Sequence, residues 1–186
     1  MNQLKMKLKT KLMVGFAIPI AALIIIASVV YGSLNSMIDS NGWVNHTHKV
    51  IASGEKILGS MVDMETGMRG YLVAGKEEFL EPYEGGQGVF KQTITTLKRT
   101  VDDNPAQVAR LTKIEELEQE WQKNAAEPQI EARRSVTSGK ATMDDVIAII
   151  QEGRGKASMD AIRAKIAEFV DEEQKLIGIR NADSES

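Results

Sequence analysis

Apolar residues follow two different patterns along the 186-residue chain. The first pattern is an uncharged run over residues 12–38. Its most apolar part, residues 12–34, would form a helix about 35 Å long at ~1.5 Å per residue. Because the hydrocarbon core of a membrane is about 30 Å thick, such a helix can cross it with some tilt. The run therefore predicts a transmembrane helix.

The charges on either side of this run predict its orientation. The first charge after it is Asp39, and only basic residues precede it: Lys5, Lys7, Lys9 and Lys11. By the positive-inside rule, residues 1–11 stay in the cytoplasm, residues 12–38 form a signal anchor, and the rest lies outside. The alternative is a cleaved signal peptide, which also has a basic start, although its apolar core is normally only about 7–15 residues long.

The second pattern begins near residue 50, where apolar positions alternate by four and three. These positions are Val50, Gly54, Ile57, Met61, Met64, Met68 and Tyr71. This is the spacing of a heptad seam on a helix. A second stripe lies on an adjacent face, at Ile51, Leu58, Val62 and Leu72. A helix with two apolar faces packs against two neighbours, as in a helical bundle.

Similar stripes recur in three later segments. They comprise Phe90, Ile94, Leu97 and Val101; Val108, Leu111, Ile114, Leu117 and Trp121; and Met159, Ile162, Ile166, Phe169 and Leu176. Glycine and proline divide the chain into helices over about 42–74, 79–101, 105–137, 142–152 and 156–181. Asn104 and Pro105 suit a helix start, and Pro128 should kink the third helix.

Short connections make successive helices antiparallel, so the sequence predicts an all-α protein: a transmembrane helix followed by an up-down four-helix bundle over residues 39–182. Four passes return the chain to the membrane. Residues 183–186 are then expected to be a linker towards a second span of about 20 apolar residues.

Composition narrows the possible functions. All 26 acidic residues but only 19 of the 23 basic residues follow the predicted span, which gives that part a net charge of −7. A nucleic-acid partner is therefore not expected. Cysteine is absent, and the two histidines, His46 and His48, would point ~200° apart on a helix, so no metal site is expected. The chain has no recognisable catalytic or nucleotide-binding motif, and we expect neither an enzyme nor a cofactor.

One polar pair interrupts the apolar stripes. Glu65 and Arg69 are four residues apart, so their side chains can bridge on one face of a helix. They form either a structural ion pair that fixes the register of the helices or a site at which Arg69 clamps a small anion. Tyr71 and Trp121, which helical spacing places in the core, complete the candidate ligand-binding residues.

Two longer motifs carry a family resemblance. Residues 63–75, DMETGMRGYLVAG, and residues 77–83, EEFLEPY, resemble the signature of the CHASE type-three domain. Residues 155–163, GKASMDAIR, through the Glu172-Glu173 pair are similar to the close of that domain. The match departs at Met68, where the family more often has a polar residue. The two motifs bracket about residues 40–180.

The resemblance implies an extracellular helical sensor, set between two membrane helices, that drives a cytoplasmic module. Our interpretation is the sensory part of a transmembrane chemoreceptor in the inner (cell) membrane of a bacterium, with a cytoplasmic N-terminus and a periplasmic or extracytoplasmic bundle. Its expected partners are a second copy of itself, the membrane, and an unknown small molecule or periplasmic protein. Two alternatives stay open: the sensor region of a histidine kinase, and a membrane-tethered helical adaptor with no signalling output.

Overall fold

The computed structural model describes residues 8–185, and the predictions for residues 1–7 and Ser186 lie outside that range. The elements follow in the order α1 (Leu8–Ala74), the 3-10 helix η1 (Glu77–Leu80), α2 (Glu81–Thr100), α3 (Pro105–Trp121), the π-helical turn η2 (Gln122–Ala126), α4 (Glu127–Thr137), α5 (Met143–Gln151) and α6 (Arg154–Glu185). No strand occurs among the described residues. The prediction of an all-α helical bundle is confirmed.

The helix α1 is longer than any single predicted helix. The predicted span and the predicted helix over 42–74 are joined without a break in α1, through Gly42. The chain divides into two units, one formed by residues 1–45 with 179–186 and the other by residues 46–178. Residues of α1 belong to both units. The apolar run and the first bundle helix are therefore parts of one helix.

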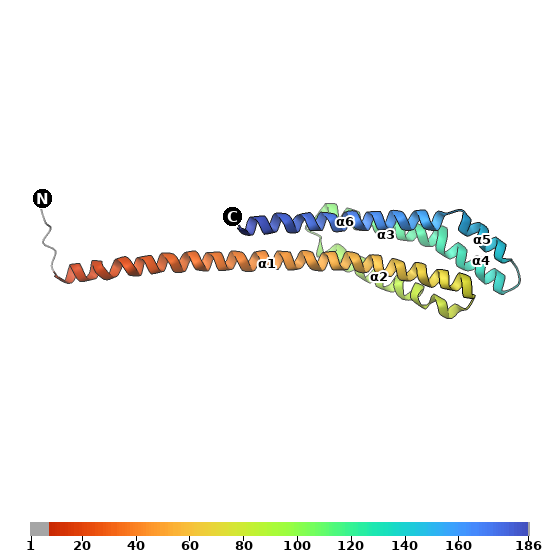
Figure 1. Cartoon of the computed structure of the whole chain (residues 1–186), viewed down its shortest axis with the longest axis horizontal. Coiled ribbons are helices and arrows are strands. Elements are labelled where there is room, and N and C mark those ends of the chain that lie inside the picture. Colours follow the sequence, from red (N-terminus) through yellow and green to blue (C-terminus); the bar gives the residue numbers. More distant parts are fainter. Residues whose placement is uncertain (1–7, 186) are drawn as a thin grey trace. The chain divides into compact units, whose positions relative to one another are not determined.

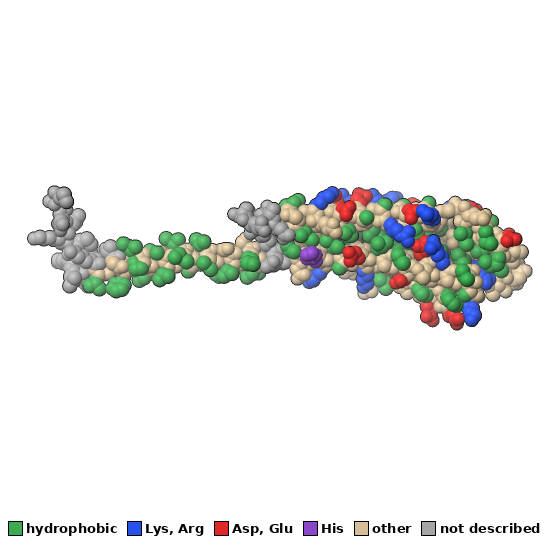
Figure 2. Space-filling model, in the orientation of Figure 1, with side chains coloured by type: hydrophobic (Ala, Val, Ile, Leu, Met, Phe, Trp, Pro, Cys, Tyr) green, Lys and Arg blue, Asp and Glu red, His purple; other side chains and the backbone are tan. Residues whose placement is uncertain are grey.

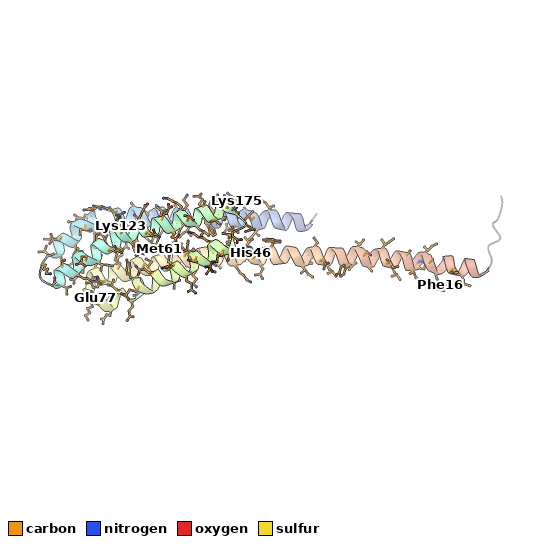
Figure 3. All side chains as sticks on the ribbon, turned by 180° about the vertical axis from the view of Figure 1, so that it is seen from behind. Phe16, His46, Met61, Glu77, Lys123 and Lys175 are labelled. Carbon is orange, nitrogen blue, oxygen red and sulfur yellow. The ribbon has the colours of Figure 1, made fainter. Side chains whose placement is uncertain are left out.

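In the first unit, every described side chain over residues 12–38 is exposed. Phe16, labelled in Figure 3, is 62% exposed, and Figure 2 shows apolar side chains along this stretch of α1. By length and composition, one helix in the described part of the chain, Gly15–Ala74 of α1, could cross a membrane. An apolar surface of this extent needs lipid or another chain to cover it.

The second unit is a bundle whose helices run lengthwise beside one another (Figure 1). Its four passes are α1 from residue 46, then α2, then the run of α3, η2 and α4, and finally α6, with the short α5 before α6. All seven residues of the predicted heptad seam are buried, so the seam is confirmed. Met61, labelled in Figure 3, is fully buried. Of the second stripe, Leu72 is buried, whereas Val62 is exposed.

The third pass contains a π-helical turn that the sequence did not predict. The sequence predicts a helix over 105–137 that is kinked at Pro128, and the structure has the π-helical turn η2 immediately before that proline. Because proline has no N–H, an α-helical carbonyl one turn earlier would lose its partner. A wider turn changes the hydrogen-bond pattern there, and the chain continues as α4. At the start of the same pass, Asn104 caps α3 as predicted, since its Oδ1 accepts from the Gln107 N–H at 3.3 Å.

Two glycines allow α1 and α2 to approach closely. A Cβ atom on Gly67 would lie 2.6 Å from the backbone nitrogen of Tyr83, and one on Gly86 would lie 2.7 Å from the carbonyl oxygen of Ser60. Both distances are too short for real atoms, so only glycine fits. This contact between backbones sets the position of Tyr83 beside α1.

Candidate functional site

A cavity of about 110 Å³, open to solvent, lies between helices of the bundle. It brings together residues from α1, from the end of α3, and from α4, α5 and α6. They are Glu65, Met68, Arg69, Leu72, Trp121, Gln129, Ile150, Gly155 and Lys156. Three of the four residues that the sequence suggests for ligand binding, Glu65, Arg69 and Trp121, therefore border one space.

The buried member of the predicted ion pair is Glu65, whose side chain is 9% exposed. Its Oε1 forms an ion pair with the Arg69 Nη2 at 2.7 Å, and its Oε2 accepts from the Nη2 of Arg163 on α6 at 3.1 Å. The Arg69 side chain is 66% exposed and that of Arg163 is 44% exposed. Glu65 thus joins α1 to α6 through Arg163, and both guanidinium groups remain open to solvent.

Sequence reasoning missed Arg163, because it is 98 positions away from Glu65 and the fold alone brings the two together. The local pattern indicates only that Arg163 lies near the core. Arg163 follows the core residue Ile162 and comes three residues after Asp160, so it stands at the edge of the buried stripe of α6.

Trp121 ends α3, immediately before the π-helical turn, and is fully buried. Its ring packs against Tyr83 on α2, with centroids 6.3 Å apart and the planes tilted by 47°. Among the described residues, the Nε1 of Trp121 and the hydroxyl of Tyr83 are buried without a hydrogen-bond partner. Burial, together with the nearby carboxylates of Glu127 and Glu118, raises the pKa of Tyr83 to about 12. Buried polar groups without partners are rare in folded proteins. Two of them on neighbouring rings distinguish this part of the core from the rest.

Tyr71, the fourth candidate residue, belongs to a different cluster. It is buried, and burial raises the pKa of its hydroxyl, as does the neighbouring Glu77 carboxylate. Glu77 accepts two bonds from Arg134 on α4, at 3.1 Å from Nε and 2.9 Å from Nη2. This hydrogen bonding lowers the pKa of Glu77. The structure therefore does not bring Tyr71 to the cavity with the other three.

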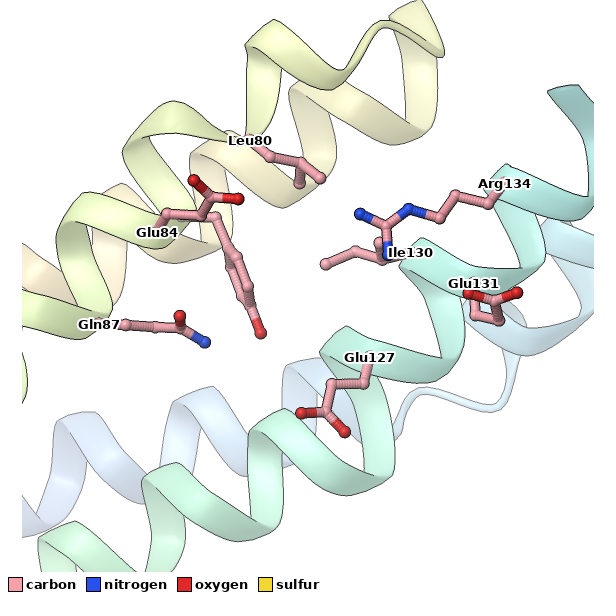
Figure 4. A pocket seen from close by; sticks show the side chains of 8 residues that line it. Leu80, Glu84, Gln87, Glu127, Ile130, Glu131 and Arg134 are labelled. Carbon is pink, nitrogen blue, oxygen red and sulfur yellow. The ribbon is translucent and has the colours of Figure 1, made fainter.

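A second cavity, of about 250 Å³, lies between α2 and α4 (Figure 4). Gln87 of α2 and Glu127, Ile130 and Arg134 of α4 face this space. It is lined by Leu80, Tyr83, Glu84, Gln87, Glu127, Ile130, Glu131 and Arg134. No pattern in the sequence indicated it, because it forms between helices that are far apart in the sequence.

A chain of polar side chains crosses from α2 to α3 beside this cavity. Gln87 Nε2 donates to Gln122 Oε1 at 2.7 Å, and the Gln122 amide donates to the carboxylate of Glu118. Glu118 is buried, and burial raises its pKa. Among the described residues, no group of three or more His, Cys, Asp or Glu side chains could hold a metal ion.

Comparison with known proteins identifies the family. Residues 40–183 match the CHASE3 domain, and the chain belongs to that family. CHASE3 is an extracellular sensor domain, so the role of this region is sensory.

One solved structure similar to this chain is the sensor domain of the histidine kinase HK9 from Rhodopseudomonas palustris. The TM-score is 0.56 with 22% sequence identity, over 70% of this chain and 97% of that one. At this identity the likeness concerns the fold. No curated protein matches the chain.

Proposed function

We propose that this chain is the sensory portion of a transmembrane chemoreceptor in a bacterial cell membrane. In this proposal the N-terminus is cytoplasmic and the bundle is periplasmic or extracytoplasmic. The observation that carries it is the continuity of α1, which combines an exposed apolar stretch with the buried seam of a CHASE3 bundle. A stimulus that moves α1 in the bundle acts on the same helix that crosses the membrane.

The cavity at Trp121 supports a mechanism in which a ligand changes the packing of the helices and no reaction is catalysed. It is bordered by helices of three passes, α1, α3 with α4, and α6, so a ligand there would contact elements that can shift against one another. A ligand that binds one packing of these helices better than another changes the populations of the two. Helix shifts of about 1–2 Å are a common form of such a transition.

Topology is the first part of the proposal to test. Single cysteines replace Asn2 and Ser138 in the cysteine-free chain, and intact cells are treated with a thiol reagent that does not cross membranes. We expect the cysteine at 138 to react and the one at 2 to react only after lysis. The opposite result would show that the orientation is wrong, and labelling of both would indicate a mixed or cleaved product.

The sensor region of a histidine kinase is the second candidate function. It is favoured by the fold likeness to HK9, whose name describes a histidine kinase. The two candidates differ in the module that follows the bundle, so sequencing the parent gene beyond codon 186 distinguishes them. A methyl-accepting helical hairpin supports the chemoreceptor, a kinase module supports the second candidate, and a stop codon favours the tethered adaptor.

We further propose that the chain forms a parallel homodimer. Val62 on α1 is 40% exposed, and a shared membrane anchor raises the effective concentration of two copies. Cysteines placed one at a time at residues 34–38 cover more than one helical turn. Disulfide crosslinking should peak on one face of the helix, and its absence at every position would contradict the dimer.

A further inference from the structure

A third cavity, of about 350 Å³, lies between α2 and the third pass, next to the cavity shown in Figure 4. It is lined by Gln87, Phe90, Lys91, Glu115, Glu118, Gln119 and Gln122. Gln87 lines both cavities, and its hydrogen bond to Gln122 joins α2 to the third pass where they meet. We call the two cavities together the α2 groove. This groove has α2 on one side and the third pass on the other.

The α2 groove is acidic. Of its lining residues, Glu115 pairs with Lys98 and Arg134 pairs with Glu77. Four other lining carboxylates form no ion pair with any residue that the structure describes: Glu84, Glu118, Glu127 and Glu131. With Lys91, the lining residues and their ion-pair partners comprise six acidic and three basic side chains, a net charge of −3. Such a groove attracts a cation that carries several charges.

Glu118 is the carboxylate that most clearly lacks a cation, because it is buried and only 5% exposed. One of its oxygens accepts from the Gln122 amide, and the other has no partner among the described residues. In that part of the chain, the enclosed side-chain atoms without a partner belong to Tyr83 and Trp121, so this second oxygen is open to the cavity that Glu118 lines. A buried carboxylate without a cation carries a free-energy cost that a cationic ligand can remove.

The apolar walls of the groove describe the rest of the ligand. Leu80, Tyr83 and Ile130 border one cavity, and Phe90 borders the other. These walls suit methylene groups better than the water shell of an inorganic ion. Among the described residues, no three His, Cys, Asp or Glu side chains are grouped so that they could hold a metal ion. The carboxylates are instead distributed along the groove, which favours an elongated organic cation.

The spacing of two carboxylates indicates the length of that cation. Glu118 and Glu127 line different cavities and are nine residues apart on the third pass. At ~1.5 Å per residue this separation is about 13 Å along the helix axis. An extended chain advances about 1.2 Å per bond. Ammonium groups about nine to eleven bonds apart therefore match the interval, and the terminal ammonium groups of spermidine lie in this range.

We propose that the α2 groove binds a linear aliphatic polyamine, with one ammonium group at Glu118, another at Glu127, and methylene groups against Tyr83 and Phe90. Such a ligand holds α2 and the third pass together. As a stimulus, it rests on the proposed sensory function. Binding itself does not, because it can be measured whether or not the chain signals. Failure of binding with the expected topology would therefore reject only this inference.

The test uses the full chain in nanodiscs of phosphatidylcholine, a lipid without net charge, so that the bilayer does not attract the probes. Calorimetric titration with spermidine should show saturable binding at one site per chain. Putrescine has two ammonium groups on a shorter chain, and butylamine has only one, so each should bind at least about tenfold more weakly. Magnesium chloride at matched ionic strength is the compact divalent control and should show no saturable binding.

Variants separate the groove from the general charge of the bundle. Glu118→Gln and Glu120→Gln each remove one negative charge from α3, but only Glu118 lines the groove. We expect the affinity for spermidine to fall at least about tenfold in Glu118→Gln and less than about twofold in Glu120→Gln. Glu127→Gln should reduce the difference between spermidine and putrescine, because the second carboxylate is then lost. Glutamine has the size of glutamate, and thermal denaturation checks that each variant is folded.

Several results would overturn the proposal. One is the absence of saturable spermidine binding at concentrations up to tens of millimolar. Equal affinity for spermidine and putrescine would show that the two carboxylates are not bridged. Saturable binding of magnesium with the same affinity, or equal losses in Glu118→Gln and Glu120→Gln, would show that only the overall negative charge attracts the probe.

Discussion

The two halves of the bundle differ in how their buried polar groups are hydrogen-bonded. In the entry half, defined by Gln107, Phe169 and Glu173, the side chain of Gln107 donates to the Phe169 carbonyl at 3.2 Å and to the Glu173 carboxylate at 2.6 Å. Its own oxygen accepts from Arg110 at 3.1 Å. In the cavity half, defined by Glu65, Tyr83 and Trp121, two buried polar atoms have no partner among the residues that the structure describes.

This difference indicates a division of roles. A fully satisfied buried network fixes one arrangement of helices, because every alternative breaks hydrogen bonds in a low-dielectric interior. Buried polar groups without partners carry a free-energy cost that a different packing of the helices can remove. We therefore expect the entry half to hold α3 and α6 in register and the cavity half to change its packing at a lower cost.

The largest effect is expected from removing the network of the entry half. Gln107→Ala leaves the buried Glu173 carboxylate without its partner and should lower the free energy of unfolding by about 3 kcal/mol. Urea denaturation followed by circular dichroism, on the full chain in mild detergent, measures it. Gln119→Ala, an exposed position on the same helix, is the control and should change stability by less than about 0.5 kcal/mol. Equal losses in both variants would refute the division of roles.

A smaller effect is expected at Glu65, and it should be non-additive. Arg69→Gln and Arg163→Gln should each cost about 0.5 kcal/mol, because each arginine is exposed and the other one still binds Glu65. The double variant should cost about 2 kcal/mol, because the buried carboxylate then has no cation. Strict additivity in the double-mutant cycle would show that the two arginines act independently.

Glu118→Gln should stabilise the cavity half by about 1 kcal/mol at neutral pH, because burial disfavours the charged carboxylate. The folded-state pKa of Glu118 is raised, so the folded protein binds more protons than the unfolded chain between the two pKa values, and its stability falls as pH rises through that window. The advantage of the variant should therefore be full above the raised pKa and absent well below pH 4.5, the ordinary pKa of this side chain. Denaturation midpoints across that pH range test this. An advantage that persists at low pH would point to packing as its cause.

The smallest change is expected for Trp121→Phe without ligand. Loss of ring volume costs about 1 kcal/mol, and removal of an unsatisfied donor returns about the same amount. The net change in the free energy of unfolding should be within about 0.5 kcal/mol. Phe169→Ala in the entry half should instead cost at least about 3 kcal/mol, because it opens a cavity in a satisfied core. A large loss in Trp121→Phe would mean that the indole N–H has a partner in solution.

Local periodicity accounts for what could be predicted from the sequence. The seam from Val50 to Tyr71 follows from heptad spacing, and the cap at Asn104 follows from residue type. The carboxylate partner Arg163 could not be predicted in this way, because the approach of α6 to α1 depends on how all the helices pack. The same is true of the contact between Trp121 and Tyr83, which also depends on where the π-helical turn falls.

The glycine contact between α1 and α2 also limits how the bundle can move. At Gly67 and Gly86 the backbones of the two helices come close together, so little space is left for one helix to slide or rotate against the other. We therefore expect the two helices to move together near this contact. Long polar side chains that can exchange partners lie at other interfaces of this pair, such as Gln122 of η2, which contacts α2, and Arg163 of α6, which contacts α1. A displacement of this part of α1 should then carry α2 with it.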